Sequence, residues 1–242
     1  LKVFALGAKP DGSFESLENA KISFKCLTAT CSIGYTKKES NDYSLTASFP
    51  KCFNAQIIAE KDGYQRSAEI ISTVEESTTS IVLEPIYELE FKVMVIDGNN
   101  IRPIQPTEQA VFTFENAEKD YVASTVYPGS DKISLIAGLY DVKSHLIVSS
   151  DSGISIPESE IKTCFDAPRE GILGALGLKE KKCKSQKIEG LNLDQIFAGG
   201  ASFTWDIDRF KLSNSKKLTL YTLRLPTPQS VQELTNIDDQ IL

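Results

Sequence analysis

Strand-type alternation is clearest in the segment Lys21-Ile22-Ser23-Phe24-Lys25-Cys26, where every second side chain is apolar or a cysteine. Side chains of a β-strand point alternately to the two faces of its sheet, so Ile22, Phe24 and Cys26 share one face. The same alternation returns in residues 43–49, whose shared face carries Tyr, Leu, Ala and Phe. These two segments predict half-buried β-strands in the first part of the chain.

Further β-rich segments follow this pair, and turn signals separate them. The turn signals include Asp11-Gly12, Asp62-Gly63 and Asp97-Gly98-Asn99-Asn100. Short strands at a spacing of roughly ten residues are typical of β-sandwiches. We therefore predict a mainly β chain of tandem Ig-like β-sandwiches with a short helical C-terminal extension. The further segments are 56–60, 81–83, 87–96, 110–115, 121–127, 132–136, 140–149, 201–207 and 218–225.

The short hinge Glu84-Pro85-Ile86 predicts a domain boundary. Residues 1–85 then form one sandwich, and residues 86–242 form a second sandwich with an extension. From about Ser150 the pattern changes, so 150–242 either completes the second sandwich or forms a small subdomain. Within it we expect a loop at 157–168, a short helix at 172–184 and a helical turn or strand at 191–197. Ser230 and Glu233 have the spacing of a capping box, which predicts a helix start.

Composition and charge exclude several functional classes. The chain has 242 residues, of which 41% are hydrophobic and 24% charged, as in ordinary globular proteins. Its net charge is −7 and its Lys and Arg are scattered, which argues against nucleic acid as a partner. No apolar run approaches the ~20 residues of a membrane-spanning helix. The strand-like start at Leu1, Val3 and Phe4 fits either a piece of a longer protein or a mature terminus.

Five cysteines fall into two groups along the chain. Cys26, Cys31 and Cys52 lie in the first third, and Cys164 and Cys183 lie in the second half. Neither group has the paired spacing or the neighbouring histidines of a zinc site. We predict a disulfide between Cys164 and Cys183 and one further pair among the first three. Disulfides indicate an extracytoplasmic compartment, and buried reduced thiols in a cytosolic protein are the alternative.

The chemistry-bearing residues form no convincing catalytic set. Alternation places His145, the single histidine, opposite the face of Leu146, which favours a solvent-facing or edge position over a general base. Asp206 and Asp208 are expected on one side of a strand beside Trp205, the arrangement a glycosidase would need. The alternative is a solvated strand face with Trp205 buried behind it. We predict no catalytic, cofactor or metal site, and treat the acidic turns at 97–100 and 151–153 as ordinary turns.

Several short motifs of the first domain occur in the order found in PEGA-like repeats. They are Gly34-Tyr35-Thr36, Lys61-Asp62-Gly63-Tyr64 and Leu83-Glu84-Pro85. On these motifs residues 1–85 resemble the transthyretin-like group of sandwiches, which includes carboxypeptidase regulatory-like and PEGA repeats. The second domain is similar in Val95-Ile96-Asp97-Gly98 and in 137–142, and nothing after about Ser150 resembles a known family. The resemblance implies a non-catalytic spacer or adhesive module of a surface protein.

These observations predict a non-enzymatic structural or adhesive module of a larger cell-surface, filament or envelope protein. Its expected partners are other protein subunits or neighbouring domains. The alternative is a carbohydrate-binding module or accessory domain of a secreted hydrolase, in which Trp205 would contact a glycan. Either function places the chain outside the cytoplasm.

Overall fold

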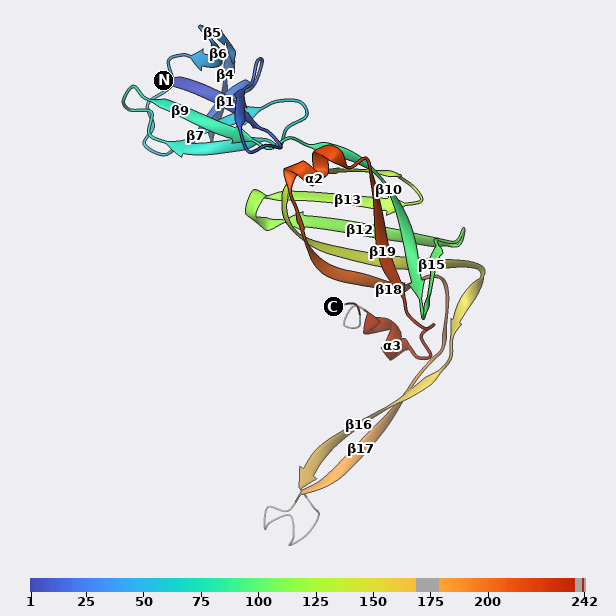
Figure 1. Cartoon of the computed structure of the whole chain (residues 1–242). Coiled ribbons are helices and arrows are strands. Elements are labelled where there is room, and N and C mark those ends of the chain that lie inside the picture. Colours follow the sequence, from blue (N-terminus) through green and yellow to red (C-terminus); the bar gives the residue numbers. More distant parts are fainter. Residues whose placement is uncertain (169–178, 238–240, 242) are drawn as a thin grey trace.

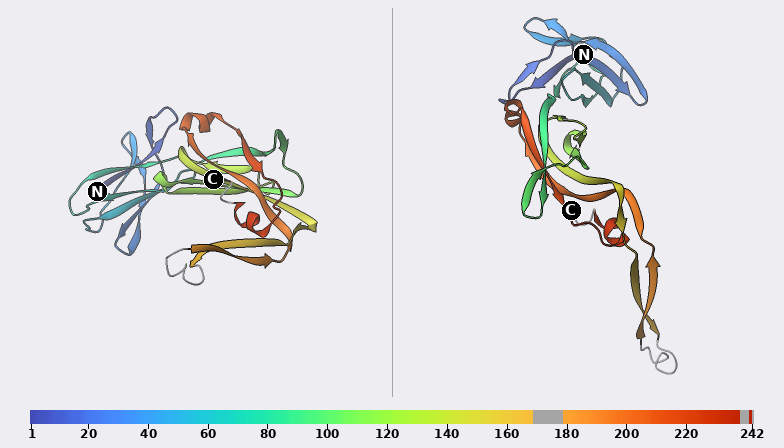
Figure 2. Two further views of the ribbon diagram at one scale, coloured as in Figure 1. Left: turned by 90° about the horizontal axis from the view of Figure 1, so that it is seen from below. Right: turned by 90° about the vertical axis from the view of Figure 1, so that its right-hand side faces the viewer.

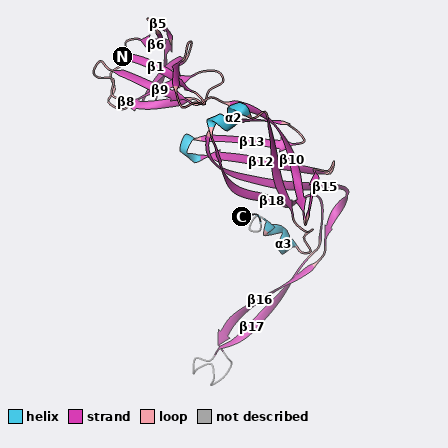
Figure 3. Ribbon diagram, in the orientation of Figure 1, coloured by secondary structure: helices cyan, strands magenta, loops and turns pink. Residues whose placement is uncertain are grey.

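A computed structural model describes residues 1–168, 179–237 and 241 of the chain (Figure 1). Strands dominate the described residues, and the helices are short (Figure 3). The predicted mainly β class is confirmed. The described residues build two hydrophobic cores that share no residue, one from positions between Val3 and Leu83 and the other from positions between Leu89 and Leu220. We call residues 1–85 the N-terminal unit, and residues 86–158 together with 189–237 the C-terminal unit.

Two sheets face each other in the N-terminal unit. The alternation predicted for residues 21–26 places Ile22 and Phe24 in the core, where they pack with Val3, Ile57 and Ile81. One sheet has the order β2 (Phe14–Ser16), β1 (Lys2–Ala8), β6 (Asp42–Thr46) and β5 (Lys37–Glu39), with β9 (Thr78–Leu83) parallel to β1. The other has the order β4 (Ala29–Tyr35), β3 (Lys21–Cys26), β7 (Ala55–Glu60) and β8 (Ser67–Ile71).

One long sheet folds over on itself to enclose the core of the C-terminal unit. Its order is β11 (Asn100–Pro103), β10 (Tyr87–Asp97), β19 (Lys217–Arg224), β18 (Leu191–Ile207), β15 (Gly138–Ile156), β12 (Glu108–Asn116) and β13 (Tyr121–Tyr127), with β14 (Lys132–Leu135) also on β10. Phe112 and Phe114 of β12 pack in one core with Phe91 of β10 and Leu220 of β19. Strands β10 and β19 therefore form one layer and β18, β15, β12 and β13 form the other.

Helices occupy the connections and the C-terminal end. The 3-10 helix η1 (Ala117–Lys119) links β12 to β13, and α2 (Arg209–Asn214) links β18 to β19. Helix α3 (Val231–Thr235) begins where the capping box predicts, because the Ser230 side chain accepts a hydrogen bond from the Glu233 backbone N–H at 3.1 Å. The predicted helical extension is therefore present.

A long two-stranded ribbon leaves the C-terminal unit. It consists of β16 (Ser159–Pro168) and β17 (Lys179–Ile188), which pair in antiparallel register along their whole length. In the views of Figures 1 and 2 it extends away from the sandwich. Among the described residues, β16 and β17 are hydrogen-bonded only to each other, and neither core includes one of their side chains. We call the described residues of this ribbon, 159–168 and 179–188, the arm.

The arm corrects two sequence predictions. Residues 159–168 form a strand where a loop was expected, and 179–184 belong to β17 where the end of a helix was expected. The rest of the predicted helix, 172–178, lies outside the described residues. The described side chains of the arm are nearly all exposed, so these strands lack the alternation that identifies a half-buried strand. Residues 191–197 belong to β18, and the predicted turn at Asp151-Ser152-Gly153 is a bulge within β15.

Candidate functional site

The junction between the two units is held by ion pairs at Glu84. This residue follows β9, and its side chain is only 13% exposed. Arg209, at the start of α2, donates from Nε to Glu84 Oε2 at 2.9 Å and from Nη2 to Oε1 at 2.6 Å. Lys119 Nζ donates to Glu84 Oε1 at 2.9 Å and to the Ala137 carbonyl at 2.8 Å. One carboxylate of the N-terminal unit thus binds two cations of the C-terminal unit.

The protonation of Glu84 follows from this geometry. Burial disfavours the charged carboxylate, but the hydrogen bonds from Arg209 and Lys119 outweigh it, so the pKa of Glu84 lies below its ordinary value. The carboxylate is therefore ionised at neutral pH, and the junction keeps its two charge-assisted contacts. The hinge at residues 84–86 predicts a domain boundary here. The ion pairs of Glu84 have no local signal in the sequence, because Lys119 and Arg209 lie 35 and 125 residues further along the chain.

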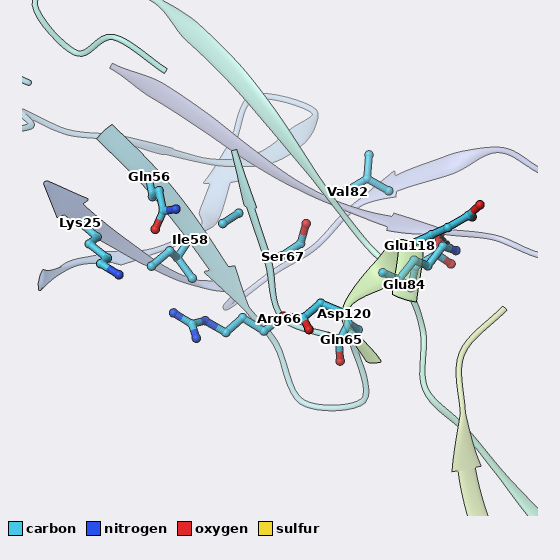
Figure 4. Close-up of a pocket in the computed structure, with 12 residues that line it drawn as sticks. Lys25, Gln56, Ile58, Gln65, Arg66, Ser67, Val82, Glu84, Glu118 and Asp120 are labelled. Atoms are coloured by element: carbon cyan, nitrogen blue, oxygen red, sulfur yellow. Dashed lines mark hydrogen bonds and ion pairs between the residues drawn. The ribbon is translucent and has the colours of Figure 1, made fainter. Parts of the chain in front are cut away.

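A groove of about 650 Å³ lies beside this junction (Figure 4). Lys25 and Arg66 of the N-terminal unit lie on one side of it, and Glu118 and Asp120 of the C-terminal unit lie on the other. Its remaining lining is mixed, with amides, small side chains and the apolar Ile58 and Val82. Small-molecule pockets are usually concave and mostly apolar. The charged and amide lining of this groove differs from that pattern.

A second ion cluster closes the far end of the C-terminal unit around Glu108. Its side chain is 0% exposed. Arg102 contacts both carboxylate oxygens, at 2.7 and 2.8 Å, and Arg224 and the Gln105 backbone N–H also donate to it. Burial disfavours the charged form, yet these donors, Arg102 first, hold the pKa of Glu108 below its ordinary value. Arg102 also pairs with Asp97 at 3.0 Å, which engages the carboxylate of the predicted acidic turn. The cluster is structural.

The two layers of the C-terminal unit separate along β18 and β19. These strands pair only at Gly199 with Arg224 and at Gly200 with Leu223. Beyond that point an apolar groove of about 470 Å³ opens between them. The side chains of Phe203 and Tyr221, 39% and 45% exposed, contribute to it. Its full lining is Ile96, Ala201, Phe203, Trp205, Leu218, Thr219, Leu220, Tyr221, Thr222 and Leu223.

Trp205 lies in this groove and against the core. Its ring is half-buried and packs against Phe114 with ring centroids 6.3 Å apart. A sugar-binding platform presents one face of an aromatic ring to solvent, whereas the ring of Trp205 packs against the core. The expectation that Asp206 and Asp208 share one strand face is wrong, because β18 ends at Ile207. Asp208 instead caps α2 by accepting from the Lys211 backbone N–H at 2.7 Å.

His145 lies on β15 and packs edge-on against Phe197, with ring centroids 5.5 Å apart. It is half-buried beside the fully buried Leu146, in line with the alternation of the strand. Its register partners are Val111 on β12 and Gly200 on β18. This position packs the imidazole against an aromatic ring.

The cysteines form two disulfides. Cys164 is bonded to Cys183, which faces it directly across the arm. Cys26 is bonded to Cys52, and both pack against the core of the N-terminal unit. Cys31 is an exposed free thiol. Among the described residues, no group of three or more His, Cys, Asp or Glu side chains is placed to hold a metal ion. No described helix combines the length and apolar character needed to cross a membrane.

Comparisons with known proteins give weak likeness in structure and none in sequence. Neither a protein-family model nor a curated protein matches the chain. Among solved structures, a minor pilin of Streptococcus agalactiae is similar over 94% of this chain and 96% of its own, with 11% identity and a TM-score of 0.37. A streptococcal ancillary pilin is similar over 93% of this chain and 62% of its own, with 12% identity and a TM-score of 0.30. The Bacillus anthracis TIE protein is similar over 92% of this chain and 50% of its own, with 13% identity and a TM-score of 0.26.

Proposed function

We propose that the chain is a non-enzymatic structural or adhesive module of a larger cell-surface, filament or envelope protein. In this proposal residues 1–85 and 86–242 are two β domains joined end to end. The ion-paired junction at Glu84 is the observation that carries it. A spacer or adhesive stalk must hold its domains in a fixed orientation, and a largely buried carboxylate between two cations restrains the angle between them.

The two disulfides support an extracytoplasmic location. Disulfides persist in oxidising compartments and are rare in proteins of the reducing cytosol. The Cys26–Cys52 disulfide lies within the N-terminal unit and the Cys164–Cys183 disulfide lies within the arm, so each stabilises local structure against unfolding. The expected partners are neighbouring domains or other subunits of the same assembly. The mixed lining of the groove at the junction provides a polar surface that such a neighbour can contact.

Localisation on intact cells tests this proposal directly. Antibodies raised against the folded chain should label intact cells of the source organism, and the protein should be recovered in the envelope or filament fraction. Thiol titration of the native protein from those cells should find one free thiol, that of Cys31. Recovery in the cytoplasmic fraction with five free thiols would sink the proposal.

A further inference from the structure

Neither hydrophobic core of the described residues includes a side chain of the arm. An isolated two-stranded hairpin is marginally stable in water. The described side chains of its two strands are nearly all exposed, and they include Phe165 at 45% exposure. The disulfide between Cys164 and Cys183 holds these strands together in place of a core. A cross-linked ribbon with an exposed aromatic side chain has the features of a docking element.

The charge of the arm is opposite to that of the rest of the chain. Residues 159–168 and 179–188 contain six Lys and three Asp and Glu, whereas the rest of the chain contains 20 Lys and Arg and 30 Asp and Glu. Side chains alternate along β16, so Phe165 and Thr163 lie on one face of the ribbon and Lys162 lies on the other. One face thus carries an aromatic group, and the opposite face carries a lysine. A basic element on an acidic chain is attracted to a second copy of that chain.

The acceptor is the edge of β18 where it separates from β19. Over residues 201–207 this strand is paired with β15 on one side, and its other edge has no ladder partner among the described residues. An unpaired edge beside an apolar groove is a template for an added strand. Asp206 is exposed on β18 and lies diagonally across from Asp141, which directly faces Glu115 on β12. The outer face of this sheet therefore carries Asp206 at the β18 edge and Asp141 and Glu115 on the two strands behind it, with Lys143 of β15 beside Asp141.

We propose that the arm of one copy docks along the β18 edge of a second copy, with Phe165 entering the groove lined by Phe203, Trp205 and Tyr221. The alternation of β16 then places Phe165 and Thr163 toward the groove and Lys162 toward the carboxylates of Asp206 and Asp141. The arm and the acceptor edge occupy different parts of the chain, so the contact is head-to-tail and propagates. This inference deepens the proposed function by naming the partner and the interface.

Sedimentation velocity of the purified chain tests this contact between copies, independently of where the protein is located in the cell. The wild-type chain should form species larger than a monomer as its concentration rises toward about 1 mM. The arm variant Phe165→Ala/Lys162→Glu and the groove variant Phe203→Lys should each weaken association by at least about tenfold. A matched control, Phe53→Ala/Lys38→Glu, changes the same residue types on the exposed surface of the N-terminal unit and should associate like the wild type.

Mixing the two variants gives the sharpest result. The arm variant retains an intact groove and the groove variant retains an intact arm, so an equimolar mixture can form one productive contact per pair. Dimers, but no larger species, should appear in the mixture and in neither variant alone, which also shows that both variants are folded. A wild-type chain that stays monomeric, or variants that associate as the control does, would overturn the inference. Neither result bears on the localisation test.

Discussion

The two disulfides of the chain lie in opposite surroundings. Cys26 and Cys52 pack against the core of the N-terminal unit, whereas Cys164 and Cys183 join two exposed strands that contribute to neither core. The first bond therefore adds to a structure that burial already stabilises. The second bond maintains a shape that burial does not. This contrast separates a body, made of the two units, from an arm whose two strands are joined by a disulfide and contribute to neither core.

The largest effect on the body is expected at Glu108. Glu108→Ala removes a buried carboxylate from two arginines and should lower the free energy of unfolding by about 3–5 kcal/mol. Urea denaturation of the C-terminal unit, followed by the fluorescence of Trp205, measures this change. Glu88→Ala breaks the exposed ion pair with Lys132 and should leave the midpoint nearly unchanged. Equal midpoints for the two variants would mean that the Glu108 cluster does not stabilise the body.

The second effect concerns the disulfide of the N-terminal unit. Cys26→Ser/Cys52→Ser opens a loop with a sequence separation of 26 residues and should cost about 3 kcal/mol of unfolding free energy. Cys31→Ser removes only the exposed free thiol and serves as the control. Calorimetry of both variants decides the point. A double variant as stable as Cys31→Ser would remove the contrast between the two bonds.

A smaller effect, on orientation, is expected at the junction. Glu84 has a lowered pKa in the folded protein, so its ion pairs persist above its ordinary pKa of about 4.3 and are lost as the pH falls through the lower folded value. Distances between spin labels on the two units should broaden in that acidic range. In Glu84→Gln the distribution should be broad at every pH. A narrow distribution in this variant would show that other contacts fix the junction.

The smallest effect on the body is expected from the disulfide of the arm. Cys164→Ser/Cys183→Ser should change the unfolding free energy of either unit by less than about 0.5 kcal/mol, because the arm packs against neither core. Limited proteolysis should nevertheless cut the arm faster in the variant than in the wild type. A loss of body stability comparable to that of the Cys26 and Cys52 variant would contradict the separation of body and arm.

Sequence reasoning succeeds where one face of an element is buried. The alternation in residues 21–26 matches β3, because core packing requires apolar side chains at every second position. A helix start can also be predicted from local sequence, because the capping residues Ser230 and Glu233 are only three positions apart. The arm is missed for the converse reason. The described side chains of its strands are nearly all exposed, so its lysine-rich sequence carries no periodic signal for strands.

The candidate sites depend on contacts between distant positions. Glu84 finds Arg209 across 125 residues, and Glu108 finds Arg224 across 116. No local pattern in a single sequence reports such a pair. The prediction for Asp208 is wrong for a related reason. Its spacing from Asp206 suggests that both side chains share one strand face, but β18 ends at Ile207 and Asp208 caps helix α2. The groove between β18 and β19 likewise arises from where two strands separate.

Hydrogen exchange of the arm at two protein concentrations tests the central claim most directly. In dilute solution the amides of β16 and β17 should exchange much faster than those of β12 and β15, because the ribbon opens without disturbing a core. At high concentration the arm amides and those on the free edge of β18 should slow together as copies dock. Arm amides that are as protected as the core in dilute solution, or unchanged at high concentration, would contradict the account.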